Sequence, residues 1–382
     1  MLIPQFDSTS SYRGDVSANL QQALPGGAAA GFSGDTNDDL KLEWINPSVV
    51  VGTVLMVVGD KAVQAALAQT SGLLFTPVCF SFGWVTYALS ALMSVYGDGR
   101  LLPPPDYAVK VFNLDSGYYR NNSNWVIARI VRDHESWMSS QEDKSNKSIR
   151  IAIFEAKPNP QGANKFTYNI LHVRGVVVIL IQLAIAAIPA FITNGREWGP
   201  LAVTSFGTIL ALAMGALPQW SAEKLPNRSG SKATFALTAG NGSRDIMIIK
   251  GQGNCIDLEE MAVSESPKKG QPWTKFPRFS FIRRHSFQPR AKETFGFPRG
   301  FFITYVTTTV IAVLWLFVMI SFAGMNEHTW ALILVGAVGL FHNTMLGSME
   351  RDSKYRNLPL TPIDTITAHK VMDGLMDLEI KK

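Results

Sequence analysis

Residues 175–195 read GVVVILIQLAIAAIPAFITNG, and none of these 21 positions carries a charge. About 20 apolar residues in a helix are enough to cross a hydrocarbon core about 30 Å thick. The stretch lacks the period-two alternation of a membrane β-strand, so it predicts a transmembrane helix. The chain has 382 residues, of which 47% are hydrophobic and two are cysteines. This composition excludes a disordered chain and a small disulfide scaffold.

Charge is missing from several other stretches, although 17% of the whole chain is charged. A soluble domain carries about 25% charged residues. The further spans that we predict from apolar runs are 72–96, 198–217, 300–323 and 328–348. A sixth span, 47–69, is interrupted by Asp60 and Lys61. The alternative for its apolar part, 47–59, is a buried or re-entrant segment of 13 residues.

The predicted fold is an α-helical membrane protein with six transmembrane helices in three hairpins. A small cytoplasmic α+β module, built from two long loops, completes it. The N-terminal tail rich in glycine and serine is expected to be disordered. The predicted segments are a tail (1–43), hairpin 1 (44–96), loop 1 (97–174), hairpin 2 (175–217), loop 2 (218–299), hairpin 3 (300–349) and a C-terminal tail (350–382).

The distribution of Lys and Arg predicts the orientation. Of the 35 cations, 33 lie in the tails and long loops, and Arg196 alone lies in a short connection between spans. Cytoplasmic loops are enriched in Lys and Arg. We therefore expect a protein of the plasma membrane or of an endomembrane, with both termini and both long loops in the cytoplasm. Four N-x-S triplets, which begin at Asn121, Asn146, Asn227 and Asn241, would instead be glycosylation acceptors in a lumen.

The long loops contain patterns of ordered structure. Residues 107–114 and 149–155 resemble strands, and 124–140 resembles a helix capped by Ser123. Residues 233–238 and 245–250 flank an Asn-Gly turn, which predicts a hairpin. Since an isolated hairpin is marginally stable, we expect one mixed sheet from both loops. An amphipathic helix is predicted to start at Thr361, with Pro362 in its first turn.

Polar groups within the spans are the first set of candidate functional residues. Ionisable side chains at membrane depth are costly and often mark an ion path or a buried pair. Such groups can also have a purely structural role. Charged side chains can extend to the membrane–water interface, and polar side chains can form hydrogen bonds between helices. The intramembrane candidates are Asp60, Lys61, Gln64, Gln182 and His342.

A second set of candidates lies near the cytoplasmic ends of the spans. A membrane enzyme would need carboxylates or a histidine at this interface, whereas the common catalytic and metal-binding motifs are missing. No cofactor and no metal are expected. The interfacial candidates are Asp98, Arg100, His172, Glu350 and Asp352.

The most biased segment, 272–302, precedes the fifth span and combines cations with aromatic residues. Such a segment is attracted to anionic lipid, which we expect as a partner beside the bilayer itself, whereas nucleic acid is not expected. The alternative is a solvated loop that only sets orientation. A phosphate on Ser286, in the kinase-like run Arg283-Arg284-His285-Ser286, would weaken the attraction. The cations are Lys275, Arg278, Arg283, Arg284, Arg290, Lys292 and Arg299.

Three motifs carry a resemblance to a known group: 97–100 with 105–107, 124–133 and 240–245. In these motifs the chain resembles uncharacterised multi-pass integral membrane proteins of filamentous fungi. The resemblance implies a membrane protein with ordered loops and no particular catalytic residue. The function expected from the sequence is a non-enzymatic membrane scaffold or sensor. The alternatives are a transporter or channel that uses the intramembrane residues, and a membrane enzyme with an interfacial site.

Overall fold

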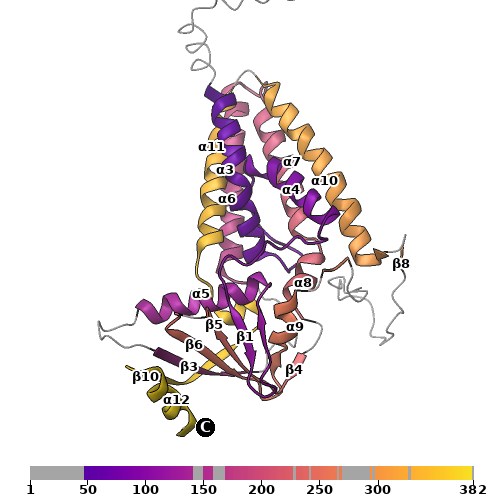
Figure 1. Cartoon of the computed structure of the whole chain (residues 1–382). Helices are drawn as coiled ribbons and strands as arrows, with labels where there is room; N and C mark the ends of the chain where they lie inside the picture. The colour runs from indigo at the N-terminus through magenta and orange to yellow at the C-terminus, as the bar shows by residue number, and fades with distance from the viewer. Residues whose placement is uncertain are drawn as a thin grey trace, which may run out of the picture. The chain divides into compact units, whose positions relative to one another are not determined.

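The computed structural model describes residues 47–140, 149–157, 168–226, 229–240, 242–264, 266–268, 293–294, 297–325 and 328–380. Apart from Pro47, they belong to one compact unit, Ser48–Lys382. This unit contains a bundle of long helices and a sheet (Figure 1). The helices of the bundle are α3 (Pro47–Thr70), α4 (Gly83–Tyr96), α6 (Ile170–Ile192), α7 (Gly199–Gly215), α10 (Arg299–Ala323) and α11 (Thr329–Ser348).

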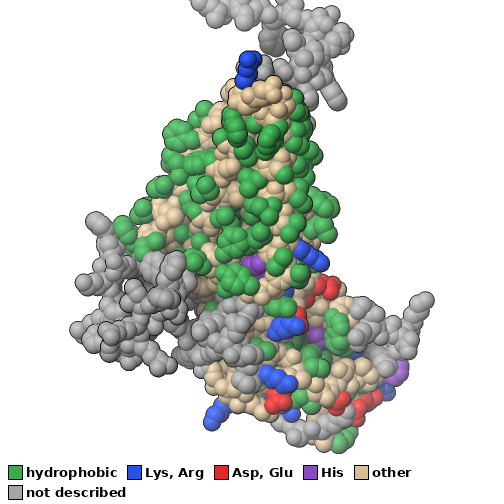
Figure 2. Space-filling view, turned by 180° about the vertical axis from the view of Figure 1, so that it is seen from behind, with side chains coloured by type: hydrophobic (Ala, Val, Ile, Leu, Met, Phe, Trp, Pro, Cys, Tyr) green, Lys and Arg blue, Asp and Glu red, His purple; other side chains and the backbone are tan. Residues whose placement is uncertain are grey.

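Among the described helices, three are long and apolar enough to cross a membrane, not the six that we predicted. They are α6, residues 300–323 of α10, and α11. The apolar helix α7 has only 17 residues, and α3 carries the Asp60–Lys61 doublet in its second half. The remaining run, 72–96, is not a single helix. On the face that Figure 2 shows, the bundle is nevertheless largely apolar, and most charged side chains lie on the part of the molecule that holds the sheet.

Residues 71–82 form a non-helical segment whose second half, 76–82, is buried inside the bundle. Pro77 lacks an N–H group and disfavours helical geometry at the preceding residue, so it disfavours one continuous helix over the whole of 72–96. Only α4, with 14 residues, is helical in the predicted span. We call residues 71–96 the re-entrant segment, because it leaves the end of α3, reaches the middle of the bundle and returns.

Helix α3 runs in the same direction as α11. A Cβ atom on Gly59 would lie 3.7 Å from Leu340, and one on Gly347 would lie 2.7 Å from Ala65. At the other end of α3, a Cβ atom on Gly52 would lie 3.0 Å from the ring of Phe322, near the end of α10. Thr86 of α4 donates to the carbonyl of Met56 and Ser90 donates to Asp60, so α4 also runs in the direction of α3 and the first predicted hairpin is not formed. Helix α3 starts at the end of the bundle that is opposite to the sheet.

The sheet has six strands in the order β10-β3-β6-β5-β1-β2. It confirms the prediction of one mixed sheet built from both loops. Strands β5 and β6 form the predicted antiparallel hairpin, and β3 pairs with β6 in parallel. The strands are β1 (Lys110–Asn113), β2 (Tyr119–Asn121), β3 (Ile149–Ala156), β5 (Thr234–Thr238), β6 (Asp245–Lys250) and β10 (Leu360–Ala368); two-stranded pairs join β4 (Ser229–Ser231) to β7 (Cys255–Ile256) and β8 (Glu293–Thr294) to β9 (Phe297–Pro298).

A helix covers each face of the sheet. On one face, Ala152 and Phe154 of β3 belong to the same hydrophobic cluster as Ile127 of α5 (Trp125–Ser140), which confirms the predicted helix. On the other face, Ile151 and Ile153 pack with the residues that contact α12 (Val371–Ile380). Because successive strand residues point to opposite faces, burial on both sides explains why β3 is almost continuously apolar. We call these strands with α5, α9 (Leu258–Val263) and α12 the sheet module.

The prediction for the C-terminus was wrong in its first half. Residues 360–368 form the edge strand β10, and the helix starts at Val371 instead of Thr361. The register is interrupted between Pro362 and Asp364, which fits the restriction of proline to edges and bulges. The β-branched side chains of this stretch and the available edge of β3 favour the strand over the helix that its capping pattern suggested.

Candidate functional site

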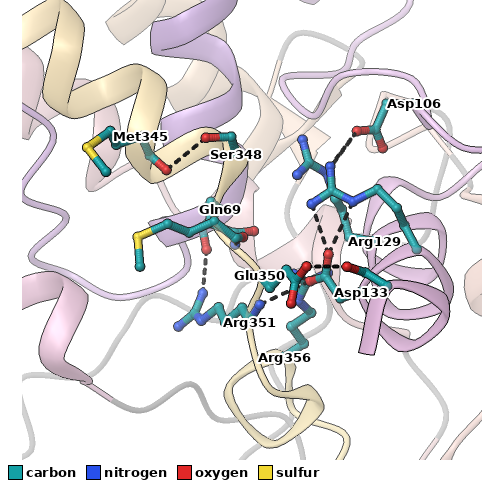
Figure 3. A network of polar contacts seen from close by, with 12 residues as sticks. Gln69, Asp106, Arg129, Asp133, Met345, Ser348, Glu350, Arg351 and Arg356 are labelled. Atoms are coloured by element: carbon teal, nitrogen blue, oxygen red, sulfur yellow. Dashed lines mark hydrogen bonds and ion pairs between the residues drawn. The ribbon is translucent and has the colours of Figure 1, made fainter. Parts of the chain in front are cut away.

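A network of charged side chains joins the sheet module to the ends of two bundle helices (Figure 3). Its centre is the carboxylate of Asp133 on α5, whose side chain is 8% exposed. The Oδ2 atom accepts hydrogen bonds from the backbone N–H of Arg351, at 3.1 Å, and from the guanidinium of Arg356. The guanidinium of Arg351 in turn donates to the carbonyl of Gln69 in the last turn of α3. One carboxylate therefore links α5 to the chain that follows α11.

The tryptophan at the start of α5 lies between two arginines of the network. The guanidinium carbon of Arg129 is 4.8 Å from the centre of the Trp125 ring, and that of Arg356 is 5.9 Å from it. Arg129 also pairs with Asp106, with 2.9 Å between Nε and Oδ2. Cation–π contacts strengthen when the groups are removed from water, and the ring is 3% exposed. We call Arg129, Asp133, Arg351 and Arg356 the interface network.

A second polar contact lies beside the interface network, at the short helix α8 (Gln219–Lys224). Glu223 accepts the backbone N–H groups of Leu101 and Leu102 at 2.8 and 2.7 Å, and Lys224 donates to the carbonyl of Ser71. Burial raises the pKa of the Glu223 carboxyl, and these hydrogen bonds oppose the effect. Glu223 thus binds the chain near the start of the first loop, and Lys224 binds the first residue of the re-entrant segment.

Positive charges crowd one another within this region. Burial lowers the pKa of Lys224 well below its usual value, and the nearby guanidinium groups of Arg351 and Arg356 lower it further. Burial also lowers the pKa of Arg351 and of Arg356 to about 10, although Asp133 opposes the effect at Arg356. All three directions have the same physical cause, since desolvation disfavours the charged form of a cation.

Inside the bundle, two amides satisfy the backbone of the re-entrant segment. The Nε2 atom of Gln182 donates to the carbonyls of Phe80 and Val335, each at 2.8 Å. Asn343 accepts the N–H of Cys79 at 3.2 Å and donates to its carbonyl at 3.0 Å. Irregular backbone at membrane depth persists only where protein groups satisfy it. Gln182, a predicted candidate, therefore bridges helices, and so does Asn343 beside the candidate His342.

The other intramembrane candidates are separate from this pair. Asp60 accepts a hydrogen bond from Ser90 of α4 at 3.0 Å, Lys61 is exposed and Gln64 is half-buried. The Nε2 atom of His342 is buried and has no hydrogen-bond partner among the described residues. In this part of the chain, no polar contact joins Asp60 to His342. The hypothesis of an ion path through them stays a prediction.

The interfacial candidates are dispersed in the same way. Each of the five contacts a different partner. The carbonyl of Asp98 accepts a hydrogen bond from Ser266, and Arg100 donates to the carbonyl of Ser264. The remaining contacts are those of His172 with Asn169, Glu350 with Ser136 and Asp352 with Lys354. None of the five bonds to another within the described ranges. The interfacial enzyme likewise stays a prediction.

Sequence analysis missed the four members of the interface network. A usable signal was present on α5, where Trp125, Arg129 and Asp133 are spaced by four residues and so share one helix face. This spacing places two charges on the same helix face as an aromatic residue, but it does not name their partners, Asp106 and Arg356. Arg351 was passed over between the candidates Glu350 and Asp352.

Other features of the described residues offer no additional chemistry. No three His, Cys, Asp or Glu side chains within these ranges are placed to hold a metal ion. An apolar groove of about 340 Å³ lies between α6 and α7, beside Phe75. Lys275, Arg278, Arg283, Arg284, Arg290, Lys292 and the predicted phosphorylation site Ser286 lie outside the described residues, as does the side chain of Arg299.

Comparisons with protein-family models, with curated proteins and with solved structures gave no match. The functional conclusion therefore rests on the residues of the chain itself.

Proposed function

We propose that the chain is a multi-pass membrane protein that acts as a non-enzymatic scaffold or sensor. In this function, the bundle holds the sheet module against one surface of the membrane. The observation that carries the proposal is the position of Asp133, which is buried between α5 and the chain that follows α11. A movement of α3 or α11 reaches the module through Gln69, Arg351 and Asp133.

The proposed topology has five crossings and one re-entrant segment. Three crossings are α6, α10 and α11, which are long and apolar enough by themselves, and we add α7 and α3 because they pack along these helices. The parallel course of α3 and α11 supports this number, because an odd number of crossings places residue 48 and the sheet module on opposite sides. The positive-inside rule supports a cytoplasmic module, since residues 97–174, 218–299 and 350–382 contain 31 Lys and Arg residues. This topology retains the predicted cytoplasmic loops and revises the predicted side of the N-terminal segment.

Labelling of sealed membranes with an impermeant maleimide tests the topology. Two single substitutions supply the labels: Ser116→Cys on the module and Arg196→Cys at the opposite end of the bundle. The native Cys79 and Cys255 are buried and remain as they are. We expect the two positions to react from opposite sides, and an epitope placed before Ser48 to be accessible with position 196. Accessibility of the epitope together with position 116 would contradict five crossings.

Distance measurements between spin labels at positions 116 and 196 test the function. If the bundle holds the module, the distribution of distances between the two labels is narrow in the chain that carries only the labels. The distribution becomes broader when Asp133→Asn is added. Asp352→Asn is the matched control, because Asp352 pairs with Lys354 at the exposed surface. Equal widths in all three proteins would contradict the proposal. Protein-dependent flux of a solute into proteoliposomes would favour the transporter instead.

A further inference from the structure

The interface network buries more positive than negative charge. Arg129 and Arg356 have side chains that are 7% and 4% exposed, and Arg351 is half-buried. Asp133 is 8% exposed, whereas the side chain of Asp106, which pairs with Arg129, is 37% exposed. Arg351 and Arg129 both act on Arg356 as repelling charges. Buried charges are normally paired, so this excess calls for a further anion.

Several guanidinium nitrogens in the network have unused donors. Nη1 of Arg129, Nε of Arg351, and Nε and Nη1 of Arg356 are buried without a hydrogen-bond partner in the described part of the chain. Buried donors are nearly always satisfied in proteins. The unsatisfied nitrogens belong to three guanidinium groups, and charged N–H donors of this kind form strong, directional hydrogen bonds with the oxygens of a phosphate.

The position of the network indicates where this anion comes from. Arg351 follows the end of α11 by three residues and bonds to the last turn of α3, so it lies at the level where the bundle helices end. In the proposed topology, which this step assumes, that level is occupied by lipid headgroups. Lys354, with a 54% exposed side chain, contacts the same Tyr355 ring as Arg351, and its charge is paired with Asp352.

We propose that Arg129, Arg351 and Arg356 bind one phosphate-bearing anion at the junction of the bundle and the sheet module. The phosphate belongs to a lipid headgroup or to a free phosphate compound, and the chemistry of recognition is the same in both cases. Asp133 competes for the same guanidinium groups. Binding of the anion therefore loosens the contact between α5 and the chain after α11, which gives the scaffold a ligand that it can sense.

The experiment uses the purified full chain. One arm reconstitutes it in nanodiscs of phosphatidylcholine, with and without phosphatidylinositol phosphate, and measures retained lipid by native mass spectrometry. The other arm keeps it in detergent and titrates inorganic phosphate or glycerophosphate against the fluorescence of the tryptophans. Binding in the first arm alone assigns the site to a lipid headgroup, and binding in the second assigns it to a free compound.

Arg351→Gln is expected to weaken binding about tenfold or more, since it removes one charged donor group. Arg196→Gln removes the same charge at the far end of the bundle and is expected to leave binding unchanged. Asp133→Asn is expected to strengthen binding, because it removes the competing carboxylate, while it weakens the coupling of module and bundle. The two proposals can thus fail separately. Binding in neither arm, or equal loss in the variants at 351 and 196, would overturn the anion site.

A variant that does not fold would be recognised by its size-exclusion profile before any titration. Arg351→Lys covers that case, because it preserves the charge and loses the planar pair of donors. We expect its affinity to lie between those of the native chain and Arg351→Gln. An affinity equal to that of the native chain would also count against recognition by the guanidinium group.

Discussion

Replacement of Asp133 by asparagine is the most direct test of the interface network. The substitution preserves the size of the side chain and removes the charge that faces Arg356, whose pKa is lowered to about 10 by burial. Loss of one partner from a buried ion pair costs about 3–5 kcal/mol, because the remaining charge is left without compensation. At about 1.4 kcal/mol per factor of ten, this cost corresponds to roughly 150- to 5,000-fold in the equilibrium for opening of the module.

Hydrogen exchange of the α5 amides, measured on the purified chain in detergent, reports this equilibrium by region. Asp352→Asn is the control, because its pair with Lys354 has side chains that are 51% and 54% exposed. An exposed pair contributes about 0–1 kcal/mol, so α5 exchange should change by no more than about fivefold. The double variant Asp133→Asn with Arg356→Gln should recover much of the protection. If exchange in Asp133→Asn rises less than about tenfold, the pair is not the link that we infer.

Three further predictions concern separate parts of the fold. Burial lowers the pKa of His134 in the module below its usual 6.5. The contribution of this neutral side chain to the free energy of unfolding is therefore present above pH 6.5 and is lost as the pH falls through the folded-state pKa. Thermal unfolding at a series of pH values should show this loss, and His134→Phe should remove the pH dependence. A Cβ atom on Gly339 would lie 1.7 Å from the Phe80 carbonyl, so Gly339→Ala should displace the re-entrant segment and lower the melting temperature in detergent, whereas Gly324→Ala, with 3.6 Å to its nearest neighbour, should not. Gln182→Leu should cost about 0.6–2 kcal/mol for each of the two lost hydrogen bonds, and a melting temperature equal to that of the native chain would argue against them.

Local patterns were sufficient for part of the sheet module. The Asn-Gly turn between β5 and β6, the apolar run of β3 and the helical period of α5 are each contained in a few neighbouring residues, and all three elements form as predicted. Residues 360–368 show the limit of such reasoning. Their capping pattern favours a helix, but pairing along the whole of β3 outweighs it. That partner is more than 200 residues away in the sequence, so no local window contains it.

The interface network shows the same limit for the candidate site. The predicted interfacial residues were chosen by their distance from the ends of the spans, and each makes its contact separately. The residues that come together are Asp133 and Arg356, which are separated by 223 positions. Their charges gave no sign of burial on their own, because a solvated charge and a buried, paired charge look alike in a sequence. Only packing against Trp125 distinguishes them.

By itself, the sequence determined that part of this chain favours a lipid environment and that part folds as a mixed sheet, because hydropathy and turn chemistry act over short distances. Tertiary structure decided which apolar runs are continuous helices. Residues 72–96 contain no charge and are long enough to span, yet their first part is not helical, and Gln182 and Asn343 satisfy its backbone at Phe80 and Cys79. Hydropathy reports the solvent that a segment prefers, whereas its conformation depends on which side chains from other helices reach its amide and carbonyl groups.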